Sequence, residues 1–205
     1  MATLTRTSEL RITTRNDTHL AYLDVLQGSW TEDQYLKLTD YNRAQFEFVD
    51  GALEELPMPT DFHQRISLWL VSMLRAYIEQ RGGVVRYSPL RMRVRAGAFR
   101  EPDLLLLLDK HDARRQNRFW LGADLVIEII SDDDPERDTV VKRAEYAAAG
   151  ILEYWIVNPD SHTLTVLTLA DDIYHEHAVF TSHDTLTSPL LHELAAPLTD
   201  VFLRD

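Results

Sequence analysis

Two runs of apolar residues, each carrying one carboxylate, constrain most strongly what this chain can fold into. The first is 104–108, directly after Asp103, and the second is 124–130, which contains Glu128. Runs this continuous are typical of β-strands covered on both faces, because such strands have no solvent side to make polar. A charge at either position costs several kcal/mol unless a partner or a metal ion offsets that cost. The two acids therefore mark the candidate functional site.

Composition narrows the class of protein. With 205 residues, 45% of them hydrophobic and 26% charged, the chain is long and apolar enough for one domain with a proper core. No apolar run reaches the ~18 residues of a membrane span, and the N-terminal residues lack the apolar block of a secretory signal, so we expect a cytoplasmic protein without a membrane partner. The absence of cysteine excludes disulfides and thiolate zinc sites. Any metal must therefore be held by oxygen or imidazole.

The charge is distributed unevenly along the sequence. A net charge of −12 argues against a protein that coats nucleic acid nonspecifically, since such binding depends on neutralising phosphates. Residues 81–118 nevertheless contain ten basic and four acidic side chains, a local charge of +6 that leaves −18 for the rest. This excess has two interpretations, a solvated strand edge with its loop or a surface that faces phosphate groups.

Periodicity and turn residues predict a lead-in over residues 1–29 and one domain over 30–205. Helices are expected at 31–39, 61–81 and 136–149, the first two at capping boxes. Strands are expected at 46–49, 52–56, 84–87, 90–94, 103–108, 124–130, 153–157, 164–169 and 173–180. This order predicts an α/β fold in which a mixed, curved sheet is flanked by a helix on each face, with extra antiparallel strands.

The paired carboxylates suit the hydrolysis of a phosphodiester bond. That reaction needs a deprotonated water and a counter-charge for the phosphoryl group, and a divalent cation held by carboxylates supplies both. Mg²⁺ prefers oxygen ligands and keeps several waters, so two acids on adjacent strands suffice for a site. Asp103, Glu128 and the backbone carbonyl of Ile129 meet this need if their strands are neighbours.

The same residues resemble a known group of enzymes. Pro102-Asp103, then Glu128 near the end of an apolar strand, then Lys142 on the next helix are similar to the active-site pattern of the PD-(D/E)XK phosphodiesterase superfamily. A closer resemblance, from about residue 30 to 168, is to the bacterial Uma2 family of restriction-endonuclease-like proteins. It rests on the segments FEFVDG at 46–51, DFH at 61–63, DLVIEIIS at 124–131, Lys142 with Tyr146, and GILEYWIV at 150–157.

The resemblance implies a fold, a reaction and a set of roles. The fold would be restriction-endonuclease-like, and the protein would be a homodimeric, Mg²⁺- or Mn²⁺-dependent endonuclease that hydrolyses DNA. Asp103 and Glu128 would hold the metal, Lys142 would be the positively charged catalytic group, and Glu47 would be an additional acid near the metal. The superfamily places its lysine two residues after the glutamate, where this chain has Ile130. The closer family moves the lysine to the following helix, which supports Lys142.

The basic stretch supplies candidate contacts to the substrate. Arg91, Arg93 and Arg95 alternate with apolar residues, so they form the exposed face of a strand and are candidate phosphate contacts. His63 begins the inward stripe of the helix at 61–81, where it is either a packed imidazole or a residue on the substrate side.

Each candidate at the site also has a purely structural interpretation. Asp103 can cap a turn, and Glu128 can pair with an arginine in the core. Asp138 precedes Lys142 by four residues, the spacing of an ion pair on a solvated helix face, with small apolar residues on the opposite face. Glu47 alternates with aromatic residues as a surface acid of a strand does.

A second function therefore remains open beside the nuclease. The chain is strongly acidic and has isoleucine at the position where the superfamily has its lysine. Both features favour a catalytically inactive nuclease-fold protein that acts as a binding or assembly module.

Overall fold

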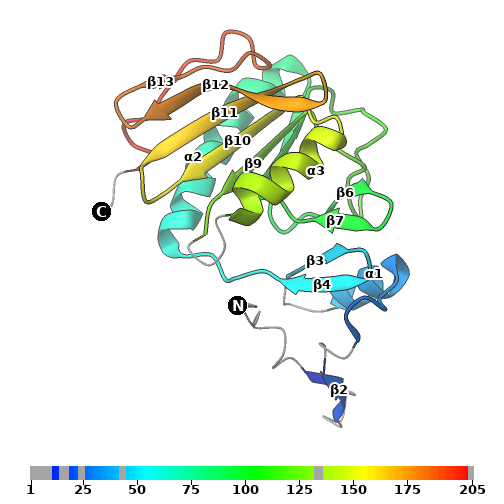
Figure 1. Ribbon diagram of the computed structural model, residues 1–205. Coiled ribbons are helices and arrows are strands. Elements are labelled where there is room, and N and C mark those ends of the chain that lie inside the picture. Colours follow the sequence, from blue (N-terminus) through cyan, green and yellow to red (C-terminus); the bar gives the residue numbers. More distant parts are fainter. Residues whose placement is uncertain (1–10, 14–18, 23–25, 42–44, 132–135, 203–205) are drawn as a thin grey trace. The chain divides into compact units, whose positions relative to one another are not determined.

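The computed structural model describes residues 11–13, 19–22, 26–41, 45–131 and 136–202, and it groups them into two compact units (Figure 1). The smaller unit comprises the described residues up to Pro57 together with Arg95–Glu101. The larger unit comprises Met58–Val94 and the chain from Pro102 onward. A compact unit is not by itself a separate domain, so the single domain over 30–205 stays a prediction. Most of the expected lead-in, 1–29, lies outside the described residues.

The smaller unit is built on a short antiparallel sheet and one helix. Strand β3 (Phe46–Val49) pairs with β4 (Ala52–Glu55) on one side and with β7 (Ala98–Arg100) on the other. Helix α1 (Glu32–Tyr41) begins at the predicted capping box, because the Thr31 amide donates to Gln34 Oε1 over 2.9 Å and the Gln34 amide donates to Thr31 Oγ1 over 3.3 Å. Two further strands, β1 (Arg11–Thr13) and β2 (His19–Tyr22), pair with each other.

The larger unit contains a six-stranded mixed sheet with the order β12-β11-β10-β9-β8-β5. Only the β9–β10 pair is parallel; the other four pairs are antiparallel. The predicted strands are confirmed, and their observed bounds are Val84–Tyr87 for β5, Leu104–Leu107 for β8, Leu125–Ile129 for β9, Glu153–Asn158 for β10, Thr163–Ala170 for β11 and Ile173–Thr181 for β12. β6 (Met92–Arg95) leads the chain toward the smaller unit.

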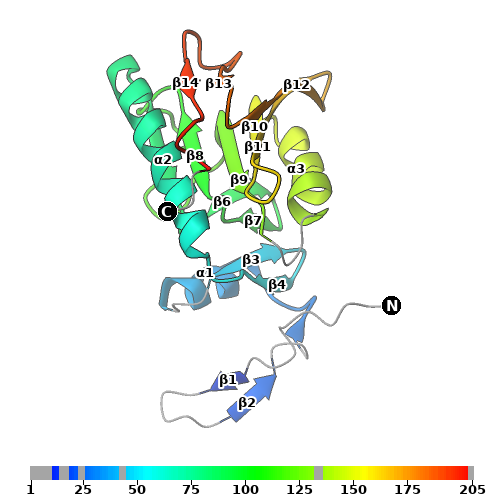
Figure 2. The same cartoon turned by 90° about the vertical axis from the view of Figure 1, so that its left-hand side faces the viewer.

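A helix covers each face of this sheet, as predicted (Figure 2). Helix α2 (Asp61–Ile78) packs one buried stripe, made by Ile66, Leu70, Leu74 and Ile78, into the core on its side. On the other face a π-helical turn, Arg137–Val141, continues into α3 (Lys142–Ala148). The N-cap of α2 is Thr60, whose side chain accepts from the His63 amide over 3.2 Å, and not the expected Asp61. Within the described part of the chain, no helix has the length and apolar composition needed to cross a membrane.

Strand β7 (Ala98–Arg100) and the structure of the C-terminal tail were not predicted from the sequence. The first is β7, which is separate from β8 although we expected the turn at 96–97 to lead straight into the Asp103 strand. The second is the C-terminal tail, where β13 (Thr185–Leu186) pairs with β14 (Ala196–Pro197). Apolar side chains of this tail join the same core as α2, among them Leu186, Leu191, Leu194 and Leu198.

A buried carboxylate fastens this tail to the sheet. Glu153 of β10 is fully buried, and it accepts hydrogen bonds from Trp155 Nε1, Ser188 Oγ and the Leu190 amide over 2.6, 2.6 and 2.9 Å. The three donors replace the water that the carboxylate loses on burial. Glu153 therefore acts as a structural clamp between the sheet and the C-terminal segment.

Candidate active site

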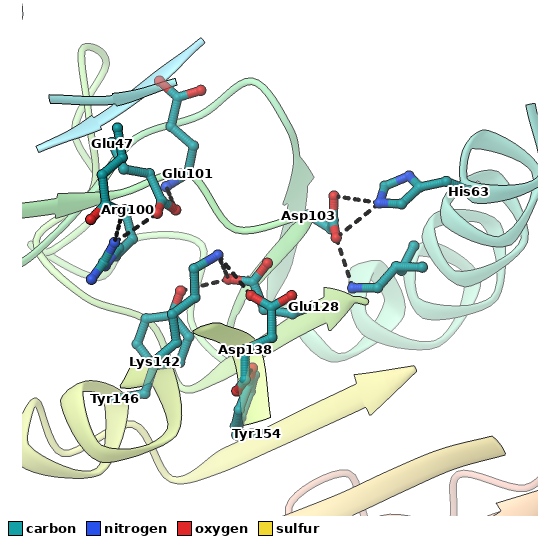
Figure 3. Close-up of polar contacts among 12 residues, drawn as sticks. Glu47, His63, Arg100, Glu101, Asp103, Glu128, Asp138, Lys142, Tyr146 and Tyr154 are labelled. Atoms are coloured by element: carbon teal, nitrogen blue, oxygen red, sulfur yellow. Dashed lines mark hydrogen bonds and ion pairs between the residues drawn. The ribbon is translucent and has the colours of Figure 1, made fainter. Parts of the chain in front are cut away.

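The pairing of β8 with β9 brings Asp103 and Glu128 to one end of the two strands. Leu104 lies opposite Ile127, and the same register continued one residue beyond β8 sets Asp103 opposite Glu128. Residues directly opposite in an antiparallel pair point to the same face. Asp103 Oδ2 also accepts from the Ile129 amide over 2.7 Å, so the acid is fixed at the end of β9 (Figure 3). The expected adjacency of the two strands is confirmed; the role of these acids as metal ligands stays a prediction.

Glu128 is buried and bound by the helix above it. Its Oε1 accepts from Lys142 Nζ over 2.9 Å and from the Tyr146 hydroxyl over 2.6 Å. A charge-assisted bond and a phenol bond on one oxygen compensate part of the cost of burying the carboxylate. The lysine that stands far from Glu128 in sequence is thus its direct neighbour in space.

Lys142 does not lie on a solvated face, and that interpretation was wrong. Its side chain is 3% exposed and lies between Glu128 and Asp138, with Nζ 2.9 Å from Glu128 Oε1 and 3.1 Å from Asp138 Oδ1. The exposed face of this segment carries Val140 and Val141, which are 62% and 47% exposed. The buried face is polar and carries Asp138, Lys142 and Tyr146. These residues share one face because residues four apart on a helix lie on the same side.

Asp138 and two tyrosines complete this buried cluster, and the sequence reasoning did not assign them to the site. The π-helical turn widens the helix at Asp138, and such turns are frequent at functional sites. The Tyr154 hydroxyl donates to the Asp138 backbone carbonyl over 2.9 Å. Burial raises the pKa of Tyr154 well above its usual value, and the nearby Glu128 and Asp138 charges raise it further, so the phenol stays a neutral donor. The signal available in the sequence was the spacing of four residues from Asp138 to Lys142 and again from Lys142 to Tyr146.

His63 contacts the candidate metal ligand from the first turn of α2. Its Nε2 lies 3.2 Å from both Asp103 carboxylate oxygens. Burial lowers the pKa of His63, but the hydrogen bond and the negative charge of Asp103 outweigh burial, so the pKa is raised overall. The imidazole therefore orients Asp103; a contact of His63 with nucleic acid stays a prediction.

Glu47 belongs to the smaller unit and is fully buried there, so the interpretation as a surface acid was wrong. Arg100 Nη1 donates to Glu47 Oε2 over 2.8 Å, and the Glu101 amide donates to Oε1 over 3.1 Å. Arg100 also pairs with Glu54, at 3.2 Å. These contacts stabilise a buried ion pair within that unit, and the proposed place of Glu47 near a metal stays a prediction.

The three arginines around β6 lie in different environments. Arg95 makes a bidentate ion pair with Asp50, in which both nitrogen–oxygen distances are 2.7 Å. Arg91 Nη2 donates to the Arg118 carbonyl over 3.3 Å, and Arg93 is half-buried. Their role as phosphate contacts stays a prediction.

Within the residues that the structure describes, no group of three or more histidine, aspartate and glutamate side chains is placed to hold a metal ion. The oxygen donors at the end of β9 are instead two side chains and a backbone group, namely Asp103, Glu128 and the Ile129 carbonyl. Because the N–H and C=O of one strand residue point to the same neighbouring strand, the Ile129 carbonyl lies on the Asp103 side.

Comparison with known proteins gives the family and the fold of the chain. The model of the Uma2 family, described as "Putative restriction endonuclease", matches residues 32–199. The chain belongs to the Uma2 family. A solved structure from Anabaena variabilis ATCC 29413, titled as a putative nuclease belonging to DUF820, is 23% identical and has a TM-score of 0.71. The match covers 84% of this chain and 97% of that one, so the two share a fold. No curated protein matches the chain.

Proposed function

We propose that this Uma2 protein is a metal-dependent endonuclease that hydrolyses DNA phosphodiester bonds with Mg²⁺ or Mn²⁺. The observation that supports the proposal is the pairing of β8 with β9, with Asp103 hydrogen-bonded to the Ile129 amide and Lys142 Nζ 2.9 Å from Glu128 of the same strand. An ordered acid, acid and lysine at one sheet end is the arrangement that the family likeness implies.

The donor set fits a hard divalent cation. Mg²⁺ is held in proteins by one or two carboxylates and keeps several waters, so Asp103, Glu128 and the Ile129 carbonyl suffice as its protein ligands. Bound there, the cation would polarise the phosphoryl group and balance the charge that develops on it. Among these donors, Asp103 is already oriented by His63 and by the Ile129 amide.

Lys142 would stabilise charge and orient the attacking water. Two carboxylates lie within 3.1 Å of its amino group and hold that group in place. A fixed cation beside the reacting phosphate stabilises the transition state without reorganising during the reaction. Tyr146 shares Glu128 Oε1 with the lysine and limits how that carboxylate can rotate.

Replacement of one acid tests the proposal. The purified protein should cleave DNA when Mn²⁺ is present, and Asp103→Asn should abolish cleavage because the amide loses one anionic metal ligand. Asp160→Asn, an exposed acid in the β10–β11 turn, is the matched control and should cleave like the wild type. Equal cleavage by Asp103→Asn would defeat the assignment.

Two observations favour the alternative, a catalytically inactive nuclease fold that serves as a binding or assembly module. Lys142 is held between two carboxylates, and the described residues contain no three-ligand metal group. Calorimetric titration with Mn²⁺ decides between the two functions, since a nuclease should respond in the millimolar range and a binding module should not. Sedimentation of the same protein tests the homodimer that the family likeness implies.

A further inference from the structure

Three cations of the basic stretch at 81–118 lack an acidic partner in the part of the chain that the structure describes. Several arginines of this stretch are neutralised: Arg81 by Glu193, Arg95 by Asp50, Arg100 by Glu47, and Arg114 by Asp112 and Asp124. No described carboxylate lies within ion-pair distance of Arg86, Lys110 or Arg115, and all three are exposed. Arg86, Lys110 and Arg115 therefore contribute positive charge that no described carboxylate neutralises.

Arg86 lies on the same face of the sheet as the candidate site. It lies opposite Leu105 in the β5–β8 pair, and Leu105 is two residues beyond Asp103. Residues two apart on a strand share a face, so Arg86 projects on the side of Asp103 and Glu128. Such diagonal neighbours have Cβ atoms about 7–8 Å apart, which is within reach of an arginine side chain. At present its Nη1 donates to the adjacent Val85 carbonyl over 2.8 Å.

Lys110 and Arg115 lie in the loop after β8, beside the N-terminal end of β5, whereas Arg86 lies toward the C-terminal end of β5. The Lys110 amide donates to the Gly82 carbonyl over 2.9 Å, and Arg115 Nη1 donates to the Lys110 carbonyl over 2.8 Å. Gly82 precedes Arg86 by four residues, which corresponds to about 13 Å of extended chain. Because β5 is the last strand of the sheet, these cations follow an edge that no further strand of the sheet covers.

We infer that Arg86 and Lys110 bind the phosphate backbone of a DNA strand along β5, directing the strand toward Asp103. The inference rests on the proposed nuclease function and adds the surface that holds the substrate. A span of about 13 Å covers a few successive phosphates of one strand of duplex DNA. In a protein of net charge −12, cations that no described carboxylate pairs with along one edge fit an extended polyanion better than a small anion. Arg115 supports the loop that presents Lys110.

The experiment measures binding of a fluorescent duplex DNA by anisotropy in metal-free buffer over a series of salt concentrations. The test variant is the double substitution Arg86→Gln/Lys110→Gln. The matched control is Arg75→Gln/Lys37→Gln, which changes the charge equally but removes cations already paired with Glu79 and Asp33. The slope of log affinity against log salt should fall by about 2 in the test variant, since each lost phosphate contact lowers it by about 1.

The outcomes separate this inference from the proposed function. It is overturned if the wild type does not bind the duplex, if the test variant keeps the wild-type slope, or if the control loses as much. Should Asp103→Asn abolish cleavage while the test variant binds normally, the nuclease stands and the β5 surface falls. Should the test variant lose binding while Asp103→Asn still cleaves, the surface stands and the assigned site falls.

Discussion

Removing the Lys142 ammonium should destabilise the fold by about 3–5 kcal/mol, because it leaves two buried carboxylates without a counter-charge. The side chains of Lys142, Glu128 and Asp138 are 3%, 5% and 4% exposed, so water cannot replace the lost partner. Lys142→Met keeps most of the length of the side chain and removes the ammonium group that donates to Glu128. Measured against a typical unfolding free energy of about 5–15 kcal/mol, this loss is large.

Urea denaturation at neutral pH, followed by tryptophan fluorescence, measures the effect. For a chain of this size, about 3–5 kcal/mol corresponds to a fall in Tm of roughly 6–20 °C. The control is Lys37→Met, whose partner Asp33 and own side chain are each 69% exposed; it should cost under about 1 kcal/mol.

A neutral replacement of the whole cluster separates charge from packing. The triple variant Lys142→Met/Glu128→Gln/Asp138→Asn leaves no uncompensated buried charge, so much of the lost stability should return. A loss below about 1 kcal/mol in Lys142→Met would refute the reasoning, since it would mean that the carboxylates find water or protons at little cost.

Three further results follow from the described contacts. Asp138→Asn should lower the rate of cleavage but leave the Mn²⁺ affinity measured by calorimetry unchanged, because it weakens the hold on Lys142 and touches no proposed ligand. Ser188→Ala should cost about 1–3 kcal/mol in urea denaturation, because buried Glu153 loses one of its three donors. Gly51→Ala should cost at least about 1–3 kcal/mol by the same assay, since its φ is +86° and a Cβ would lie 2.7 Å from the Gly28 carbonyl oxygen.

The periodic elements of the larger unit were predictable from the sequence. Helix α2 has a full apolar stripe, and β8 and β9 are runs of apolar residues, so local patterning and burial point to the same structure. The metal-site hypothesis required these two strands to be neighbours, and their pairing meets that condition. The C-terminal tail was not predictable, because its leucines have no regular spacing and reach the core through contacts distant in sequence.

The orientation of α3 shows why the site was only partly predictable. Small apolar residues normally mark the buried face of a helix, and here Val140 and Val141 face solvent. A polar stripe is buried instead, because Lys142 finds both of its partners inside the larger unit. One partner, Glu128, lies on a strand fourteen residues earlier in the chain, a pairing that helix periodicity cannot reveal.

Because Lys142 of α3 contacts Glu128, strand β9 does not need a lysine of its own next to the glutamate. Position 130 is occupied by an isoleucine that packs against the apolar cluster on the α3 side of the sheet, where the superfamily pattern would need a charged residue. A pattern search that demands lysine two residues after the glutamate would reject this chain. Chains with this fold are better recognised by the distance between ammonium and carboxylate in space than by counting along the sequence.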